Sequence, residues 1–181
     1  MNMKQLLAIP DLDAHCSAHL KYRDLVECGE TQSRTKFPNL PVELETYAAL
    51  QGLATHILDP VISKYGNIEL TYGFGSTQLV RRMLPPKRVA PKLDQHAAHE
   101  RNAAGQFICD RLGAACDFLV NGQDMRDVAQ WVFNNTPVDR LYFYGNDKSI
   151  HVSFSQTGKH QFVELISRDN ERRVPRVVRI S

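Results

Sequence analysis

The sequence predicts an α+β fold in which helices flank a mainly antiparallel sheet. Three features predict this class: a long segment with helical periodicity at 41–66, an amphipathic helix at 124–134, and strand-like runs concentrated in the C-terminal half. Strands and helices do not alternate regularly, as they would in a doubly wound parallel sheet. Helices that come before and after the strands therefore favour a layered α+β arrangement.

Length and composition fit one soluble globular domain. The chain has 181 residues, of which 43% are hydrophobic and 23% are charged, and its net charge is +2. Such a small charge does not by itself indicate binding to a polyanion. The four cysteines form no CxxC pair and the first residues show no export signal, so we expect reduced thiols. We therefore expect a cytoplasmic protein, or a phage protein released at lysis, with no membrane segment.

The chain divides into an N-terminal arm at 1–40, packed on a body at 41–181. In the body, the first helix is expected to end at Gly66, with a kink at Pro60. A strand at 68–72 then leads into the turn Gly73-Phe74-Gly75-Ser76. The elements expected after this turn are a helix at 77–83, a helical turn at 96–102, strands at 107–109 and 113–120, a helix at 124–134, strands at 140–144, 150–154 and 161–166, and an edge strand or tail at 168–181.

Two polar residues lie inside strands that are otherwise apolar. Asp117 interrupts the run Ala114–Val120, and His151 lies in Ile150–Phe154. Burying a carboxylate is costly unless it is paired, hydrogen-bonded or bound to a metal. A carboxylate and an imidazole on neighbouring strands, with a second histidine, can bind Zn²⁺ and leave a fourth position open. A hydrogen-bonded core histidine and a surface aspartate are the alternative, because no fixed-spacing motif such as HExxH is present.

The order of these segments resembles the zinc D-Ala-D-Ala carboxypeptidase superfamily, whose fold also occurs in the Hedgehog signalling domain. The matching residues are Gly113, Ala115 and Asp117, which fit the family's Gly-x-Ala-x-Asp segment, and Ile150-His151-Val152-Ser153, which fits the strand of the last zinc ligand. The similarity covers roughly residues 44–155. It implies a zinc-dependent hydrolase that acts on an amide or peptide substrate, with His96, Asp117 and His151 as metal ligands.

Three residues compete for the position of the first zinc ligand. The resemblance favours His96, because Asp94-Gln95-His96 is similar to the family's Ser-x-His segment. His99 would share a face with His96 on a helical turn and is the second candidate. His96 lies 21 positions before Asp117, whereas a family-like spacing of about seven positions would select Asp110. A loop insertion costs little free energy, so we expect His96.

Two positions depart from the family pattern. Gly75 stands where the family has an arginine that recognises a substrate carboxylate, so this recognition is expected to be lost. The exception would be that the side chain of Arg81 or Arg82 extends to the same place. The family's catalytic glutamate is also missing before the last histidine. Asp147 is the expected general base and Glu100 is the alternative, although Asp147 also suits an ordinary turn.

Two other functions remain open. Loss of both the arginine and the glutamate is also what a catalytically inactive metal-binding or interaction module on the same fold would show. Two basic clusters are compatible with nucleic-acid association, although such clusters are more often solvated surface. The clusters are Arg81, Arg82, Lys87, Arg88 and Lys92, and Arg168, Arg172, Arg173, Arg176 and Arg179. Nucleic acid is therefore the less favoured partner.

Overall fold

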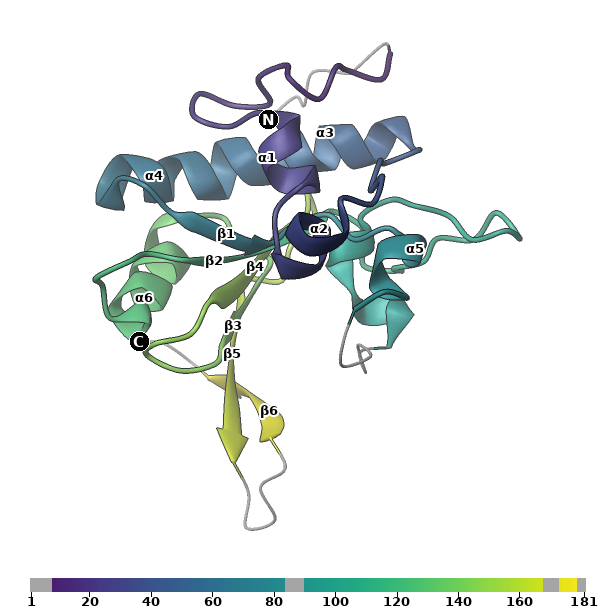
Figure 1. Cartoon of the computed structure of the whole chain (residues 1–181). Coiled ribbons are helices and arrows are strands. Elements are labelled where there is room, and N and C mark those ends of the chain that lie inside the picture. Colours follow the sequence, from purple (N-terminus) through teal and green to yellow (C-terminus); the bar gives the residue numbers. More distant parts are fainter. Residues whose placement is uncertain (1–7, 84–89, 168–172, 179–181) are drawn as a thin grey trace.

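A computed structural model describes residues 8–83, 90–167 and 173–178 of the chain. Its strands form one six-stranded sheet in the order β1-β2-β4-β3-β5-β6 (Figure 1). The strands are β1 Glu69–Tyr72, β2 Ala114–Leu119, β3 Arg140–Phe143, β4 Ile150–Phe154, β5 Gln161–Ser167 and β6 Arg173–Val178. Neighbouring strands are antiparallel except β3 and β5, which are parallel. The predicted α+β class is confirmed, and the parallel pair makes the sheet mixed.

The helices lie before and between the strands. They are α1 Tyr22–Val26, α2 Glu30–Thr35, α3 Leu44–Leu53, the π-helical turn η1 Ala54–Leu58, α4 Asp59–Tyr65, α5 Thr77–Val80, the 3₁₀ turns η2 Pro91–Leu93 and η3 Gln95–Ala97, and α6 Met125–Asn135. Figure 1 shows α3, η1 and α4 as one long helical segment across the sheet. Pro60 has no backbone N–H and cannot donate a hydrogen bond to the carbonyl four residues before it. The wider π-helical turn η1 lies where this hydrogen bond is missing.

The hydrophobic core lies on one face of the sheet. The register partners Cys116, Val152 and Leu141, from three neighbouring strands, are all fully buried there. The long helical segment and α6 both cover this face, and the rings of Tyr65 and Trp131 join them edge-to-face with centroids 5.6 Å apart. The opposite face is therefore left for polar side chains.

Residues 8–40 share this core. The buried ring of Tyr22 in α1 packs edge-to-face on Tyr47 of α3, with centroids 5.4 Å apart. Asp59 at the start of α4 accepts a hydrogen bond of 2.8 Å from the Ser17 hydroxyl. The N-terminal part of the described chain is thus attached to the long helix by both apolar and polar contacts.

The strand predicted at 107–109 is wrong. Phe107 forms only an isolated bridge with Arg101, and its ring lies under the guanidinium of that arginine at 3.9 Å. The apolar run Phe107–Cys109 is therefore part of a loop that packs locally. Of the edge strand or tail expected at 168–181, the described part forms the edge strand β6, which pairs with β5, and 168–172 and 179–181 lie outside the described residues.

Candidate metal centre

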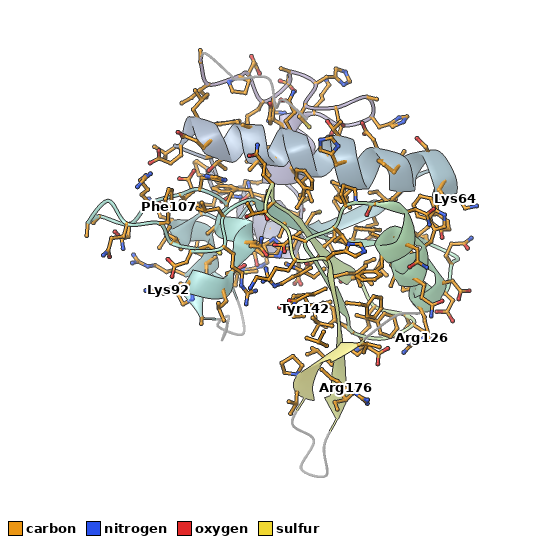
Figure 2. The ribbon with its side chains drawn as sticks, turned by 180° about the vertical axis from the view of Figure 1, so that it is seen from behind. Lys64, Lys92, Phe107, Arg126, Tyr142 and Arg176 are labelled. Carbon is orange, nitrogen blue, oxygen red and sulfur yellow. The ribbon has the colours of Figure 1, made fainter. Side chains whose placement is uncertain are left out.

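A row of side chains crosses the polar face of the sheet. Across β1, β2, β4 and β3 the register partners are Tyr72, Asp117, His151 and Tyr142. Directly paired residues on neighbouring strands project from the same face. Leu70 pairs with the core residue Phe118, which directly follows Asp117 in β2. A register shift between Leu70 and Tyr72 skips one residue of β1, so that Tyr72 pairs with Asp117 and joins this row. Figure 2 shows Tyr142 near the middle of the molecule, with Lys92 and Phe107 to one side and Arg126 to the other.

His96 reaches the same row from η3, in the loop between α5 and β2. Asp94 begins this turn by accepting a hydrogen bond from the His96 backbone N–H at 3.2 Å. The His96 Nδ1 lies 2.8 Å from the Gly73 carbonyl oxygen, which can only accept. Nδ1 therefore donates to this carbonyl, and Nε2 is the nitrogen that faces Asp117 and His151. The loop is polar in sequence, yet His96 is only 4% exposed.

Three donor atoms form a compact triangle. The His96 Nε2 lies 3.1 Å from the His151 Nδ1 and 3.2 Å from the Asp117 Oδ1, and the last two atoms are 2.8 Å apart. A tetrahedral zinc ion with bonds of about 2.0–2.1 Å holds its ligand atoms about 3.3 Å apart. Within the described ranges, this is the group of three metal-ligating side chains that comes together. The donor set fits a small metal ion with little adjustment.

The electrostatics favour the protonation states that bind metals. Burial alone would raise the pKa of Asp117, but the neighbouring His96 and His151 imidazoles, by charge and hydrogen bonding, hold it well below its usual range. Burial lowers the pKa of His151, against the opposing effect of Asp117. An ionised carboxylate and a neutral imidazole are the forms that coordinate a metal. Both are therefore available at neutral pH.

The triangle opens into a cleft of about 490 Å³, a volume typical of small-ligand sites. Tyr72 and Tyr142 line it, and their rings lie against the two imidazoles. The ring centroids of Tyr72 and His96 are 4.2 Å apart, and those of Tyr142 and His151 are 5.3 Å apart. These contacts restrict rotation of the imidazoles and hold their nitrogens toward the cleft.

The two rival ligand candidates have other contacts. The His99 Nε2 accepts a hydrogen bond of 3.2 Å from the backbone N–H of Gly113. Asp110 is exposed and lies 3.7 Å from the Lys92 ammonium. The structure thus brings together His96, Asp117 and His151, and it places His99 and Asp110 outside that triangle.

The two candidate bases lie away from the cleft. Asp147 is exposed in the turn between β3 and β4 and does not line the cleft. Glu100 is buried and its Oε1 accepts hydrogen bonds from the Val42 backbone N–H at 3.0 Å and from the Thr46 hydroxyl at 2.8 Å. Among the described lining residues, the acidic side chains besides Asp117 are Asp94 and Glu30, and sequence reasoning selected neither as a general base.

A side chain at Gly75 would require the Tyr72 ring to move. A Cβ at this position would lie 2.2 Å from the Tyr72 hydroxyl oxygen, so the tyrosine fills the space that the resemblance assigns to an arginine. Arg81 and Arg82 are exposed and do not line the cleft. The arginine that does line it, within the described chain, is Arg111.

The basic clusters are only partly visible. The cluster members that lie outside the described residues are Lys87, Arg88, Arg168, Arg172 and Arg179. Arg176 lies on the hairpin of β5 and β6 (Figure 2).

All four cysteines are free thiols, as expected from the sequence. No helix in the described ranges has the length and apolar character needed to cross a membrane.

Comparisons with known proteins return no matching family model, no matching curated protein and no matching solved structure.

Proposed function

We propose that the protein is a zinc-dependent hydrolase of an amide or peptide bond, and a divergent relative of the zinc D-Ala-D-Ala carboxypeptidase superfamily. The observation that carries the proposal is the triangle of His96, Asp117 and His151 at an open cleft. Two imidazoles and one carboxylate are a donor set that zinc enzymes use, and a fourth position remains for water or substrate. The order of the matching segments along the chain supports the same family.

Each residue around the site has a role that its contacts suggest. When bound, zinc lowers the pKa of a coordinated water and polarises the carbonyl of the scissile bond. The Gly73 carbonyl accepts a hydrogen bond from the His96 Nδ1 and so leaves Nε2 as the nitrogen that can coordinate a metal. Asp94, beside His96 and lining the cleft, is the carboxylate best placed to accept a proton. Burial raises the pKa of Tyr144, another lining residue, so its hydroxyl stays protonated and can donate a hydrogen bond to substrate.

The metal centre is tested by single alanine substitutions with matched controls. We expect H96A, D117A and H151A each to lower zinc affinity by about 100-fold or more, because each removes one of three protein ligands. H99A and D110A serve as controls and should keep wild-type affinity, since neither residue belongs to the triangle. Competition with a chromogenic chelator measures the affinities. Retention of zinc by both D117A and H151A would refute the site.

A catalytically inactive metal-binding module is the second candidate. It is favoured by the position of Asp147, which is exposed outside the cleft. Incubation of the zinc-loaded protein with peptidoglycan fragments and a panel of peptide amides, with and without a chelator, separates the two functions. Turnover that the chelator abolishes supports the hydrolase. Bound zinc without turnover of any amide supports the module.

A further inference from the structure

Part of the cleft has an apolar lining, formed by Leu79, Met83 and Leu93. Leu79 lies in α5 and is 1% exposed, whereas Leu93 ends η2 and is 49% exposed. Of the large exposed hydrophobic residues in the described chain, Leu93 is the one that lines the cleft. A single exposed leucine is ordinary on a protein surface. An exposed leucine that continues a buried apolar lining into an open cleft instead marks a surface that a ligand can cover.

Packing within the fold does not account for this apolar lining. Neither Met83 nor Leu93 belongs to the hydrophobic core of the described chain, and neither packs against it. Met83 is half-buried, and Leu93 lies in a short 3₁₀ turn that its backbone hydrogen bonds already hold. Their side chains therefore leave apolar surface in contact with water, and burial of this surface by a bound group would be favourable.

Backbone hydrogen bonds connect the apolar lining to the turn that carries His96. The Gly75 N–H donates a hydrogen bond of 2.9 Å to the His96 carbonyl oxygen, and the N-cap of α5, the helix of Leu79, directly follows Gly75. On the other side, Leu93 directly precedes Asp94, whose carboxylate accepts the hydrogen bond of 3.2 Å from the His96 backbone N–H. The apolar lining and a ligand of the candidate metal centre therefore belong to one hydrogen-bonded unit.

We propose that the apolar lining binds an apolar side chain of the substrate that is at least as large as leucine, next to the amide bond that lies at the metal. This inference rests on the proposed function. The free energy gained by burial scales with the apolar area removed from water, and the methyl group of an alanine would cover little of three such side chains. The flexible, unbranched side chain of Met83 lets the apolar lining adapt to groups of different shape. We therefore expect a preference for large apolar residues over alanine.

The test uses small hydroxamates, which bind zinc and carry one acyl chain. Titration calorimetry compares acetohydroxamate with butanohydroxamate and hexanohydroxamate on the zinc-loaded protein. Hexanohydroxamate should bind about 10-fold or more tighter than acetohydroxamate, because each buried methylene adds to the affinity. L93S should reduce this advantage, and L93S combined with M83S should remove most of it, with zinc content and acetohydroxamate affinity unchanged. L40S is the matched control, since Leu40 has a similar exposure of 52% and does not line the cleft, and it should keep the advantage.

The outcomes separate this inference from the proposed function. If the longer hydroxamates bind no tighter than acetohydroxamate, or if the double variant keeps their advantage, the apolar subsite is refuted while the metal centre stands. An equal loss in L93S and L40S would also overturn it, because Leu40 lies outside the cleft. If the protein takes up no zinc, or if acetohydroxamate does not bind the zinc-loaded protein, the proposed function fails and the apolar subsite fails with it.

Discussion

Glu100 is a buried carboxylate with a structural explanation. Its oxygens accept hydrogen bonds from the backbone N–H groups of Val42 and Glu43 and from the Thr46 hydroxyl, all at the start of α3. A negative charge at the first turn of a helix is also favoured by the helix dipole. The residue that directly follows His99 therefore anchors the long helix, and its contacts do not lead into the cleft.

We expect E100A to lower the free energy of unfolding by about 2 kcal/mol or more, because buried donors lose a charged acceptor. Urea denaturation of the metal-free protein measures this loss, and zinc affinity should stay at the wild-type value. A variant that is fully stable but inactive would instead assign Glu100 to catalysis.

At the same scale, the sequence predicted the three side chains of the triangle better than the other residues that line the cleft. Asp117 and His151 were recognisable because each interrupts an apolar strand, and the strand register places them side by side. His96 required the resemblance, since its loop has no periodicity that fixes its path. Asp94 and Arg111 were missed as cleft residues for the same reason: loops bring them to the cleft, and local sequence patterns do not encode where a loop goes.

Among the elements, β2 depends on the tight turn at its start. Gly113 has φ of 77°, and a Cβ there would lie 2.2 Å from the Phe154 carbonyl oxygen in the neighbouring strand. Gly122, after the same strand, has a similar φ of 79° but nothing within 4 Å. Substitutions at the two glycines therefore distinguish the cost of backbone strain, which applies at both positions, from the cost of close packing, which applies at Gly113.

We expect G122A to cost about 1 kcal/mol of unfolding free energy, which is the strain of a left-handed conformation. G113A should cost clearly more, because β2 and β4 must also move apart, and it should weaken zinc binding since these strands carry Asp117 and His151. Urea denaturation and chelator competition measure both effects. Equal costs for the two variants would contradict the close approach.

Elements with strong periodicity were predicted well, and so were the short strands β1, β3, β4 and β5, whereas the short helices near the N-terminus were not. The helix at 124–134 and the strand at 113–120 correspond closely to α6 and β2. The short helices α1 and α2 lie in the expected N-terminal arm and were not predicted. Helices of five and six residues carry too little periodic signal, and they form by packing on the rest of the fold. The parallel pairing of β3 with β5 was also missed, since pairing between distant strands is decided by the whole sheet.

On the scale of the whole molecule, the buried thiol of Cys16 and the partly buried thiol of Cys28 make the free energy of unfolding fall at alkaline pH. Burial raises the pKa of Cys16 from 9.0 to about 12, and it raises that of Cys28 to about 12 as well. The unfolded chain releases these protons near pH 9, whereas the folded chain keeps them. The stabilisation is therefore complete below pH 9 and is lost as the pH rises toward 12.

We expect the free energy of unfolding to fall above pH 9 by up to about 1.4 kcal/mol per pH unit for each such thiol. C16A should show a shallower decline than the wild type between pH 9 and pH 10.5, although packing loss lowers its stability at pH 7. Urea denaturation under reducing conditions measures the slopes. Identical slopes would show that the Cys16 thiol ionises as easily in the folded chain as in the unfolded chain.

The contact between Tyr72 and Gly75 also makes these two positions depend on each other. The Tyr72 hydroxyl occupies the volume into which any side chain at position 75 would have to grow. An arginine at position 75 therefore requires the Tyr72 ring to move, and we expect G75R to be tolerated better together with Y72A than alone, as measured by the midpoint of urea denaturation.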